Sequence, residues 1–430
     1  MERRDPYLRE VFAAVAQSET GLSREQIERR TKLTHLAVKH AVCTLADRGF
    51  IDIGPYHCDR LPMGHPVSII QTKLCVLGVK ILPSAVIGVV TDLSCEVLSG
   101  GADGQELTAT RELPNGRHDE ETVVREVAEL VGELVANLPE GYSVLGAGVE
   151  LGGHVNRATG TVVYSPNLQW HNVELGRRLS GVLGRQLKDV RGEWAGATAF
   201  QVVIENDVNT LAAEAQWSGA GSGHESFALV LVGDGVGCGL VINYELVHGA
   251  TGLAGELGHL VINPDNPDLT CRCGNSGCLE TIAATPGILN AIVRAKKDRG
   301  EDPPATITEA AQLAQRGDAD ARRAFEVAGD ALARAFSYVL NLLNPEALIL
   351  ETYDQYVTDL LMSSIARGLR RYCFSTARSD AEMPIMEVAL ERGAKGAAAI
   401  MITKLLGQVL PHAPTRSVPV ARGDRQTQPR

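Results

Sequence analysis

The segment from Gly255 to Ala283 contains three cysteines and one histidine in a short stretch of chain. Cys271, Cys273 and Cys278 offer sulfur ligands, and His259 offers a ring nitrogen. Three thiolates and one imidazole form a tetrahedral set of the kind that Zn²⁺ prefers. Because four protein ligands leave no open position for water, we expect this Zn²⁺ to be structural. The alternative interpretation is a surface loop whose cysteines are free or disulfide-bonded.

Two further motifs accompany this segment, the sequence NDVN at 206–209 and the glycine-rich sequence GDGVGCG at 233–239. Together with the cysteine segment, they resemble the ROK family, whose name stands for repressors, open reading frames and kinases. The resemblance extends over about residues 74–408, which is most of the chain. It implies an α/β, actin-like ATPase (ribonuclease H-like) fold with two lobes, a sugar-binding cleft, and either kinase or transcriptional repressor activity.

The resemblance also implies a set of residues that hold sugar hydroxyls in the cleft. Amides and carboxylates suit this role because they can orient and pair with neighbouring hydroxyls. The set comprises Gly152, Asn167, Asn206, Asp207, Glu256, His259 and Glu280. Asp207 is the position of the kinase general base, and its alternative role is a helix N-cap, because a helical run follows it. For Glu256 and Glu280 the alternative is a solvated carboxylate.

The residues that would bind a nucleotide depart from the pattern of the family's kinases. Lys80 stands at the aspartate that organises Mg²⁺ in Asp-x-Gly-Gly-Thr, and Leu82 and Pro83 replace its glycines. Asp234 replaces a threonine of the second phosphate motif, and Glu351-Thr352 replaces the glycine pair beside adenosine. Losing about 1–2 kcal/mol at each of these contacts would weaken nucleotide binding about a thousandfold or more. We therefore expect a degenerate ATP site and no catalytic residues, with a sugar kinase as the alternative.

Residues 1–72 have the pattern of a small DNA-binding domain. Helical periodicity spans 7–17, a capping box at 23–26 opens a second helix, and a third helix runs from Thr34 to Gly49. The expected buried stripe of this third helix is Leu36, Val38, Val42 and Leu45. Two apolar pieces around a tip rich in Gly and Pro then predict a β-wing. The pattern resembles a winged helix-turn-helix, and the alternative is a helical interaction or dimerisation module.

On the winged-helix interpretation, one set of polar side chains faces DNA. Its members are Thr34, His35, Lys39 and His40 on the third helix and Arg60 and His65 in the wing. Residues 1–73 contain 11 Lys and Arg against 9 Asp and Glu, a formal net charge of +2, whereas the remaining residues carry −13. A slightly basic head on an acidic body indicates that the phosphates of a nucleic acid would contact the head, and not the whole surface of the protein.

From residue 73 onward, strand-like and helix-like segments alternate, which predicts a parallel or mixed sheet with ligands at the carboxyl ends of its strands. We expect the sugar-binding domain to span 73–408. Lobe one should comprise about 73–201 together with a C-terminal helix at about 390–408, and lobe two about 202–389. Residues 409–430 are rich in Pro, Arg and Gln, and we expect them to be disordered.

The sequence contains neither an apolar run of about 18 residues nor an apolar N-terminal leader, so we expect a cytoplasmic protein without a membrane span. Its nine cysteines fit a metal site with scattered thiols better than a disulfide framework. The expected function is a sugar-responsive transcriptional repressor that binds an operator as a homodimer or homotetramer. The effector is a sugar or a sugar phosphate. A third possibility is a vacant cleft in a protein that acts through protein partners.

Overall fold

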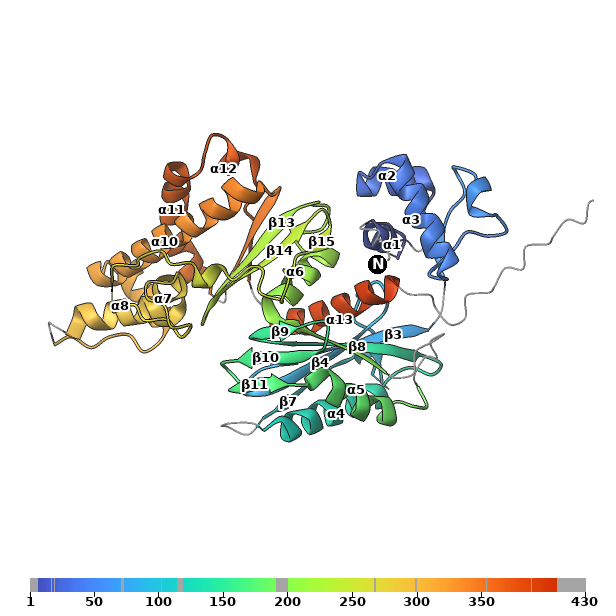
Figure 1. Ribbon diagram of the computed structural model, residues 1–430, viewed down its shortest axis with the longest axis horizontal. Coiled ribbons are helices and arrows are strands. Elements are labelled where there is room, and N and C mark those ends of the chain that lie inside the picture. Colours follow the sequence, from blue (N-terminus) through green and yellow to red (C-terminus); the bar gives the residue numbers. More distant parts are fainter. Residues whose placement is uncertain are drawn as a thin grey trace, which may run out of the picture.

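The computed structural model describes a small head at residues 7–70 and two lobes that meet at helix α13 (Figure 1). The described residues are 7–16, 18, 20–70, 73–101, 103–113, 119–190, 200–266, 268–297, 300–352, 354–387 and 389–407. Within them, no helix combines the length and the apolar composition that crossing a membrane requires. The tail at 409–430, predicted to be disordered, lies outside the described residues.

The head consists of three helices and a short two-stranded antiparallel ribbon. The elements are α1 (Leu8–Ala16), α2 (Arg24–Thr31), α3 (His35–Asp47), β1 (Ile51–Asp52), the 3-10 helix η1 (Cys58–Arg60) and β2 (Ser68–Ile69). Ser23 and Gln26 form the predicted capping box of α2, and Thr34 caps α3. The predicted helices and the two pieces of the ribbon are therefore present.

The buried stripe of α3 differs from the predicted one at its first position. Val38, Val42 and Leu45 are fully buried, and Ala41 completes their face, but Leu36 is 74% exposed. Two residues turn a helix by about 200°, so position 36 projects from the side opposite to position 38. The prediction that Leu36 is buried was therefore wrong.

A disulfide joins Cys43 of α3 to Cys58 of η1, with Cα atoms 5.4 Å apart. It ties the third helix to the segment between the two ribbon strands. We did not predict this pair, because two of nine cysteines separated by 15 positions carry no pairing signal in a single sequence.

Lobe one is built on a five-stranded sheet with the order β12-β8-β3-β4-β7. Strand β3 (Leu74–Ile81) pairs antiparallel with β4 (Ala85–Thr91) and parallel with β8 (Ser143–Leu151). The other elements are β5 (Ser99–Gly100), β6 (Gln105–Glu106), β7 (Thr108–Glu112), α4 (Glu120–Ala136), β9 (His154–Asn156), β10 (Thr161–Ser165), β11 (Trp170–Val173), α5 (Leu175–Gln186) and β12 (Gln201–Asn206). Because β12 pairs in parallel with β8, the expected boundary between the lobes at about 202 lies one strand too early.

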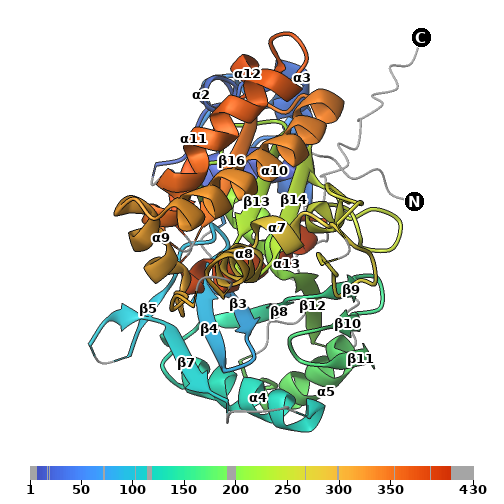
Figure 2. The same cartoon turned by 90° about the vertical axis from the view of Figure 1, so that its left-hand side faces the viewer.

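Helix α13 (Leu390–Leu406) packs against one face of this sheet, and α4 and α5 cover the other (Figures 1 and 2). A Cβ on Gly78 of β3 would lie 2.0 Å from the carbonyl oxygen of Ala394, and one on Gly148 of β8 would lie 1.8 Å from that of Ala397. Only glycine permits such a close approach of helix and strand. The first turns of α13 therefore lie directly over β3 and β8.

Lobe two also contains a five-stranded sheet, with the order β15-β14-β13-β16-β17. The predicted hairpin is β13 (Phe227–Val232) with β14 (Val236–Ile242), and the predicted strand β16 (Ala347–Thr352) pairs in parallel with β13. The other elements are α6 (Asp207–Ser218), β15 (Glu245–Leu246), η2 (Leu257–His259), α7 (Glu280–Ala283), α8 (Thr285–Lys297), α9 (Ile307–Gln315), α10 (Ala319–Leu343), α11 (Gln355–Tyr372), α12 (Ala377–Asp380) and β17 (Ile385–Glu387). Helix α6 follows β12 directly and is buried over most of its length, so it connects the two lobes through the interior.

Candidate functional site

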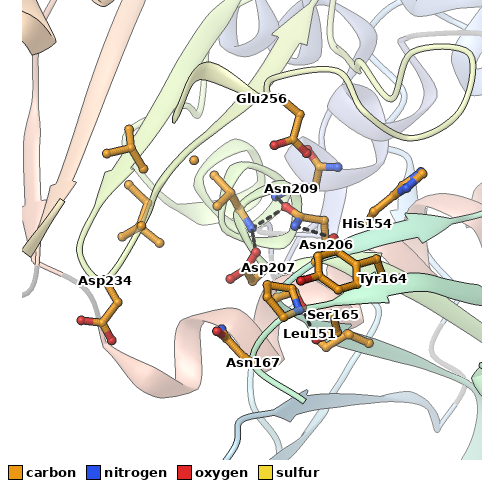
Figure 3. Close-up of a pocket in the computed structure, with 18 of the residues that line it drawn as sticks. Leu151, His154, Tyr164, Ser165, Asn167, Asn206, Asp207, Asn209, Asp234 and Glu256 are labelled. Carbon is orange, nitrogen blue, oxygen red and sulfur yellow. Dashed lines mark hydrogen bonds between the residues drawn. The ribbon is translucent and has the colours of Figure 1, made fainter. Parts of the chain in front are cut away.

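A cavity of about 770 Å³ lies between the lobes, where β3, β8 and β12 end (Figure 3). The carboxyl ends of parallel strands are the usual place for ligands in such sheets. All seven predicted sugar-contacting residues line this cavity, namely Gly152, Asn167, Asn206, Asp207, Glu256, His259 and Glu280. The structure therefore brings together residues that are separated by up to 128 positions in the chain.

Three of these residues converge at the centre of the cavity. A Cβ on Gly152 would lie 3.2 Å from Oδ2 of Asp207 and 3.3 Å from Nδ2 of Asn167. Glycine thus leaves open the space between a carboxylate and an amide. A hydroxyl group in this space can donate to the carboxylate and accept from the amide.

Asn206, and not Asp207, caps helix α6. Its Oδ1 accepts hydrogen bonds from the backbone N–H groups of Val208 (2.9 Å) and Asn209 (3.3 Å), and its Nδ2 donates to the carbonyl of Gly153 (3.1 Å). The side-chain amide of Asn206 also donates a hydrogen bond to the Asp207 carboxylate. The Asp207 carboxylate faces the cavity at its centre (Figure 3), and its Oδ1 also accepts a hydrogen bond from the backbone N–H of Val208 (3.0 Å). Burial raises the pKa of Asp207, and the Lys80 ammonium opposes this shift.

Lys80 and Glu150 form a buried ion pair at one side of the cavity. Nζ of Lys80 lies 2.6 Å from Oε1 of Glu150, and both side chains are buried. Thr210 of α6 donates its hydroxyl to Oε2 of the same carboxylate. Gly393 of α13 makes room for the pair, because a Cβ there would lie 2.2 Å from Oε1 of Glu150. The pair is therefore enclosed by β3, β8, α6 and α13.

A second set of buried charges links the same helices to lobe two. Arg392 of α13 lies 2.8 Å from Glu351 of β16 and 2.6 Å from Glu214 of α6. Burial raises the pKa of Glu351 to about 7, and Arg392 opposes this shift. Two of the positions that a nucleotide would need, Lys80 and Glu351, thus bind other side chains of the chain itself.

The four predicted metal ligands come together beside the cavity. The ligand atoms of His259, Cys271, Cys273 and Cys278 all lie within 4.8 Å of one another. The sulfur atoms of Cys273 and Cys278 are 3.7 Å apart, and Sγ of Cys271 is 3.5 Å from Nδ1 of His259. With Zn–S bonds of about 2.3 Å, the ligands of a tetrahedral site lie roughly 3.7 Å apart, so this donor set fits Zn²⁺.

His259 and Glu280 connect the cysteine cluster to the cavity. Nδ1 of His259 faces Cys271, and its Nε2 lies 3.8 Å from Oε2 of Glu256. Oε1 of Glu280 lies 2.9 Å from Sγ of Cys271, and a Cβ on Gly235 would lie 3.8 Å from its other oxygen. Each side chain therefore offers one atom to the cluster and one to the cavity.

A buried clamp that we did not predict positions the start of α6. Oε2 of Glu205 accepts a hydrogen bond from Nε2 of His248 (2.9 Å), and its Oε1 accepts one from Nδ2 of Asn209 (2.9 Å). Burial acts to raise the pKa of Glu205, but the hydrogen bonds from His248 and Asn209 outweigh it and lower the pKa. The clamp ties β12 to the loop that carries Glu256. No spacing in the sequence relates Glu205 to His248, because 43 positions separate them.

A family model described as the ROK family matches residues 95–404. The chain belongs to the ROK family. The glucokinase of Thermotoga maritima is 28% identical over 313 residues, which cover 70% of this chain and 91% of the relative. The xylose repressor of Caldicellulosiruptor bescii is 26% identical over 297 residues, 67% of this chain and 70% of the relative. A crystal structure of a ROK family transcriptional regulator, a homolog of the E. coli MLC protein, has a TM-score of 0.70 and 21% identity and covers 94% of this chain and 96% of its own.

These similarities confirm the predicted ROK membership and the two-lobe actin-like fold. A kinase and a repressor resemble this ROK chain to nearly the same degree. The choice between catalysis and regulation therefore depends on the residues of its cleft and its head.

The predicted DNA-facing residues of this ROK protein lie on α3 and in the segment between the ribbon strands. They are Thr34, His35, Lys39, His40, Arg60 and His65. His35 also contacts Glu28 of α2, with Nδ1 2.7 Å from Oε1, and His65 packs edge-on against Tyr56 with ring centroids 4.8 Å apart. The exposed side chain of Leu36, which was predicted to be buried, lies on the same helix.

The head of the ROK chain docks on the C-terminal end of α6. Arg9 of α1 is buried, donates a hydrogen bond from Nη1 to the carbonyl of Gln216 (3.0 Å), and lies 5.9 Å from the centroid of the Trp217 ring. Trp217 is itself buried in the same apolar cluster as the core of the head. Helix α6 therefore has Asp207 in the cavity at one end and Trp217 under the head at the other.

Proposed function

We propose that this ROK protein is a sugar-responsive, DNA-binding transcriptional repressor with a degenerate ATP site. The observation that carries the proposal is the buried ion pair of Lys80 and Glu150 at the position of the kinase Mg²⁺ aspartate. A nucleotide would have to separate this pair, which costs about 3–5 kcal/mol, and place its phosphates near Asp234. Phosphoryl transfer from ATP is therefore disfavoured, while the side chains that would contact a sugar line the open cavity.

In this proposal, Asp207 accepts a hydrogen bond from a sugar hydroxyl without a phosphoryl donor to serve. Asn167 orients a neighbouring hydroxyl, Asn206 holds the Asp207 carboxylate in place, and Glu256 pairs with a further hydroxyl. A site that is built to hydrogen-bond hydroxyls discriminates well against ligands that lack them, because its buried polar groups are then left unpaired.

We further propose that His259, Cys271, Cys273 and Cys278 hold a structural Zn²⁺. When bound, the ion supplies four bonds that fix the loop and leaves no position for a reacting water. His259 would coordinate through Nδ1 and keep Nε2 for the sugar side of the cavity. The ion thus orients a sugar-contacting side chain without taking part in chemistry.

The head is proposed to act as a winged helix-turn-helix with α3 in the major groove. Lys39 and His40 would meet bases or phosphates, and Arg60 would reach the backbone or the minor groove. Leu36 adds an apolar contact of the kind that recognises the methyl group of thymine. The disulfide between Cys43 and Cys58 holds the wing segment against α3 in this arrangement.

Coupling between sugar and operator is proposed to run through α6. The helix has 12 residues and is thus about 18 Å long. A sugar that binds differently to two arrangements of the lobes shifts α6 at Asp207, and the head follows at Trp217. In a homodimer or homotetramer, this changes the spacing of two heads on one operator.

The proposal is tested on the purified full-length protein. Thermal-shift screening of sugars and sugar phosphates identifies the effector, because a ligand stabilises the state that it binds. Selection from random DNA identifies an operator, and fluorescence anisotropy then measures its Kd with and without the effector. We expect at least a tenfold change in Kd. A chain that selects no DNA sequence would contradict the regulatory function.

The coupling itself is tested by Arg9→Met, which removes the hydrogen bond to Gln216 and the cation above the Trp217 ring. A hydrogen bond from a charged group contributes about 1.5–3 kcal/mol, so the head should dock more weakly on α6. The effector should then change the operator Kd less than twofold. Arg177→Met, at an arginine that is 78% exposed on α5, is the control and should keep the full response. An unchanged response in Arg9→Met would contradict this route.

The alternative function is a ROK-type sugar kinase, which is favoured by the glucokinase relatives and by Asp207 at the centre of the cavity. Incubation with Mg-ATP and a panel of hexoses, pentoses and N-acetyl amino sugars decides between the two. Steady, sugar-dependent release of ADP would establish the kinase. If no sugar stabilises the protein and operator binding persists, a protein partner is the better candidate for the effector.

A further inference from the structure

We propose that the outer part of the cavity holds a second sugar ring, so that the effector is an oligosaccharide of at least two rings. This inference rests on the proposed function, because it adds a subsite to the same sugar-binding cavity. Gly152, Asn167 and Asp207 would bind one ring at the centre of the cavity. The outer subsite is formed by a row of aromatic side chains on the three-stranded sheet β11-β10-β9.

The aromatic row consists of residues that stand opposite one another on three strands. Tyr164 of β10 pairs with His154 of β9 on one side and with His171 of β11 on the other. Directly opposite residues of antiparallel strands project from the same face of the sheet. His154 and Tyr164 line the cavity, and His171 is exposed beside them, so the row leads from the cavity to its outer rim.

Tyr164 is accessible and packs against a neighbouring ring. Its ring centroid lies 4.8 Å from that of His171, with the ring planes at 35°, and the side chain is still 41% exposed. No residue in the described part of the chain hydrogen-bonds to its hydroxyl. An aromatic ring with an available polar tip suits a sugar ring, which has apolar C–H faces and a polar edge.

At the mouth of the cavity beside this row, a loop of lobe two packs against β9. Nε2 of His154 donates a hydrogen bond to the carbonyl of Thr251 (2.8 Å). Gly252 has a φ of +91°, and a Cβ there would lie 2.3 Å from the carbonyl oxygen of Val155. This close packing of the lobe-two loop on β9 brings Leu253 to the cavity wall, where it is 46% exposed. An apolar side chain and two aromatic rings therefore line the outer end.

The size of the cavity supports a ligand longer than one ring. Pockets of about 300–1,000 Å³ accommodate drug-sized ligands, and a single hexose is much smaller than those. The cavity has about 770 Å³, and its lining extends from Asp234 on the side that a nucleotide would occupy to Tyr164 and Leu253 on the other side. In Figure 3, Tyr164 and Asp234 lie on opposite sides of Asp207, so a ligand anchored at Asp207 can extend toward the aromatic row.

Isothermal titration calorimetry on the full-length protein tests the second ring directly. The probes are matched sets: glucose with maltose and cellobiose, xylose with xylobiose, and N-acetylglucosamine with chitobiose. We expect one disaccharide to bind at least about fivefold more tightly than its monosaccharide, since an aromatic contact is worth about 1 kcal/mol or more. Tyr164→Ala should remove this gain and leave the affinity for the monosaccharide within twofold. Tyr164→Phe should keep most of it.

Tyr356→Ala is the matched control, because Tyr356 is also an exposed tyrosine, at 54%, but lies on α11 outside the cavity. It should not change either affinity. Equal affinities for each monosaccharide and its disaccharides in the wild type would overturn the outer subsite while leaving sugar sensing intact. If Tyr164→Ala weakened the binding of the monosaccharide and the disaccharide equally, the outer subsite would also be overturned, because Tyr164 would then contact the first ring. If no sugar of either size binds, the proposed function fails and the subsite fails with it.

Discussion

Replacing Lys80 with methionine should destabilise the protein more than removing both members of its ion pair. Nζ of Lys80 lies 2.6 Å from Glu150, and the two side chains are 6% and 0% exposed. Methionine keeps the apolar stem of the side chain and leaves the Glu150 carboxylate with a hydrogen bond from the hydroxyl of Thr210 but without its cation. Breaking a buried pair on one side costs about 3–5 kcal/mol, whereas replacing both charges with apolar groups is often nearly neutral.

Urea unfolding at pH 7 measures these differences in the free energy of unfolding. Lys80→Met should lose about 3–5 kcal/mol, and the double variant Lys80→Met/Glu150→Met should lose less than about 2 kcal/mol. Lys395→Met is the control, because Lys395 lies 3.7 Å from Glu96, whose side chain is 62% exposed. A surface pair of this kind contributes about 0–1 kcal/mol.

The pH dependence of the single variant provides a second check. Burial raises the pKa of Glu150, and Lys80 opposes this shift, so its removal should raise the pKa further. A carboxyl whose folded pKa lies above its unfolded value favours folding as the pH falls toward that unfolded value. Lys80→Met should therefore recover stability relative to the wild type on acidification. A single variant within 1 kcal/mol of the wild type, or a double variant as unstable as the single one, would refute the role of the ion pair.

Three further predictions concern the metal cluster, the head and Glu351. Cys271→Ser should lower the zinc content measured by mass spectrometry and weaken effector binding, because His259 loses its anchor; unchanged zinc and unchanged binding would contradict the structural role. Cys43→Ser should destabilise the head by about 3 kcal/mol, since the bridge closes a loop of 15 residues, and hydrogen exchange on α3 should quicken; identical exchange in the oxidised wild type and the variant would argue against it. Burial raises the pKa of Glu351 from 4.5 to about 7. Between about pH 5 and pH 7 the folded protein therefore keeps a proton on Glu351 that the unfolded chain has lost. This group thus makes the free energy of unfolding fall as the pH rises through that range. Glu351→Gln should flatten that fall in pH-dependent urea unfolding, and equal slopes in the two proteins would count against the shift.

The features that sequence reasoning anticipated are mainly local ones. The capping box at Ser23 and the cap at Thr34 each depend on residues a few positions apart. The metal ligands from Cys271 to Cys278 lie within eight positions, and a single tight loop brings them together. The head helices and most of the cysteine cluster could therefore be predicted from residues that are close together in the sequence.

The wrong prediction at Leu36 and the open choice of a cap for α6 also have local causes. Leu36 has the right residue type for a core position, but helical rotation places it opposite to Val38. Asn206 and Asp207 are both good capping residues, so the residue types alone do not identify the cap. The choice is made by β12, which continues through Asn206 and leaves Asp207 as the first residue of α6.

The remaining features required contacts between distant segments. Lys80 and Glu150 are brought together by the parallel pairing of β3 and β8, in which they stand opposite each other. The clamp of Glu205 and His248 joins two lobes, and the aromatic row around Tyr164 depends on the register of three strands. A single sequence contains no signal for such registers, so these parts of the site could not have been predicted from it.

The closeness of Gly393 to Glu150 makes three positions of the cleft depend on one another. An alanine at 393 would place its methyl group on the carboxylate of Glu150, so glutamate at 150 requires glycine at 393. A lone carboxylate at this depth is in turn costly without the ammonium of Lys80. Exchanging any one of the three residues alone should therefore destabilise the fold, and an aspartate introduced at 80 would face Glu150 and require a second change there.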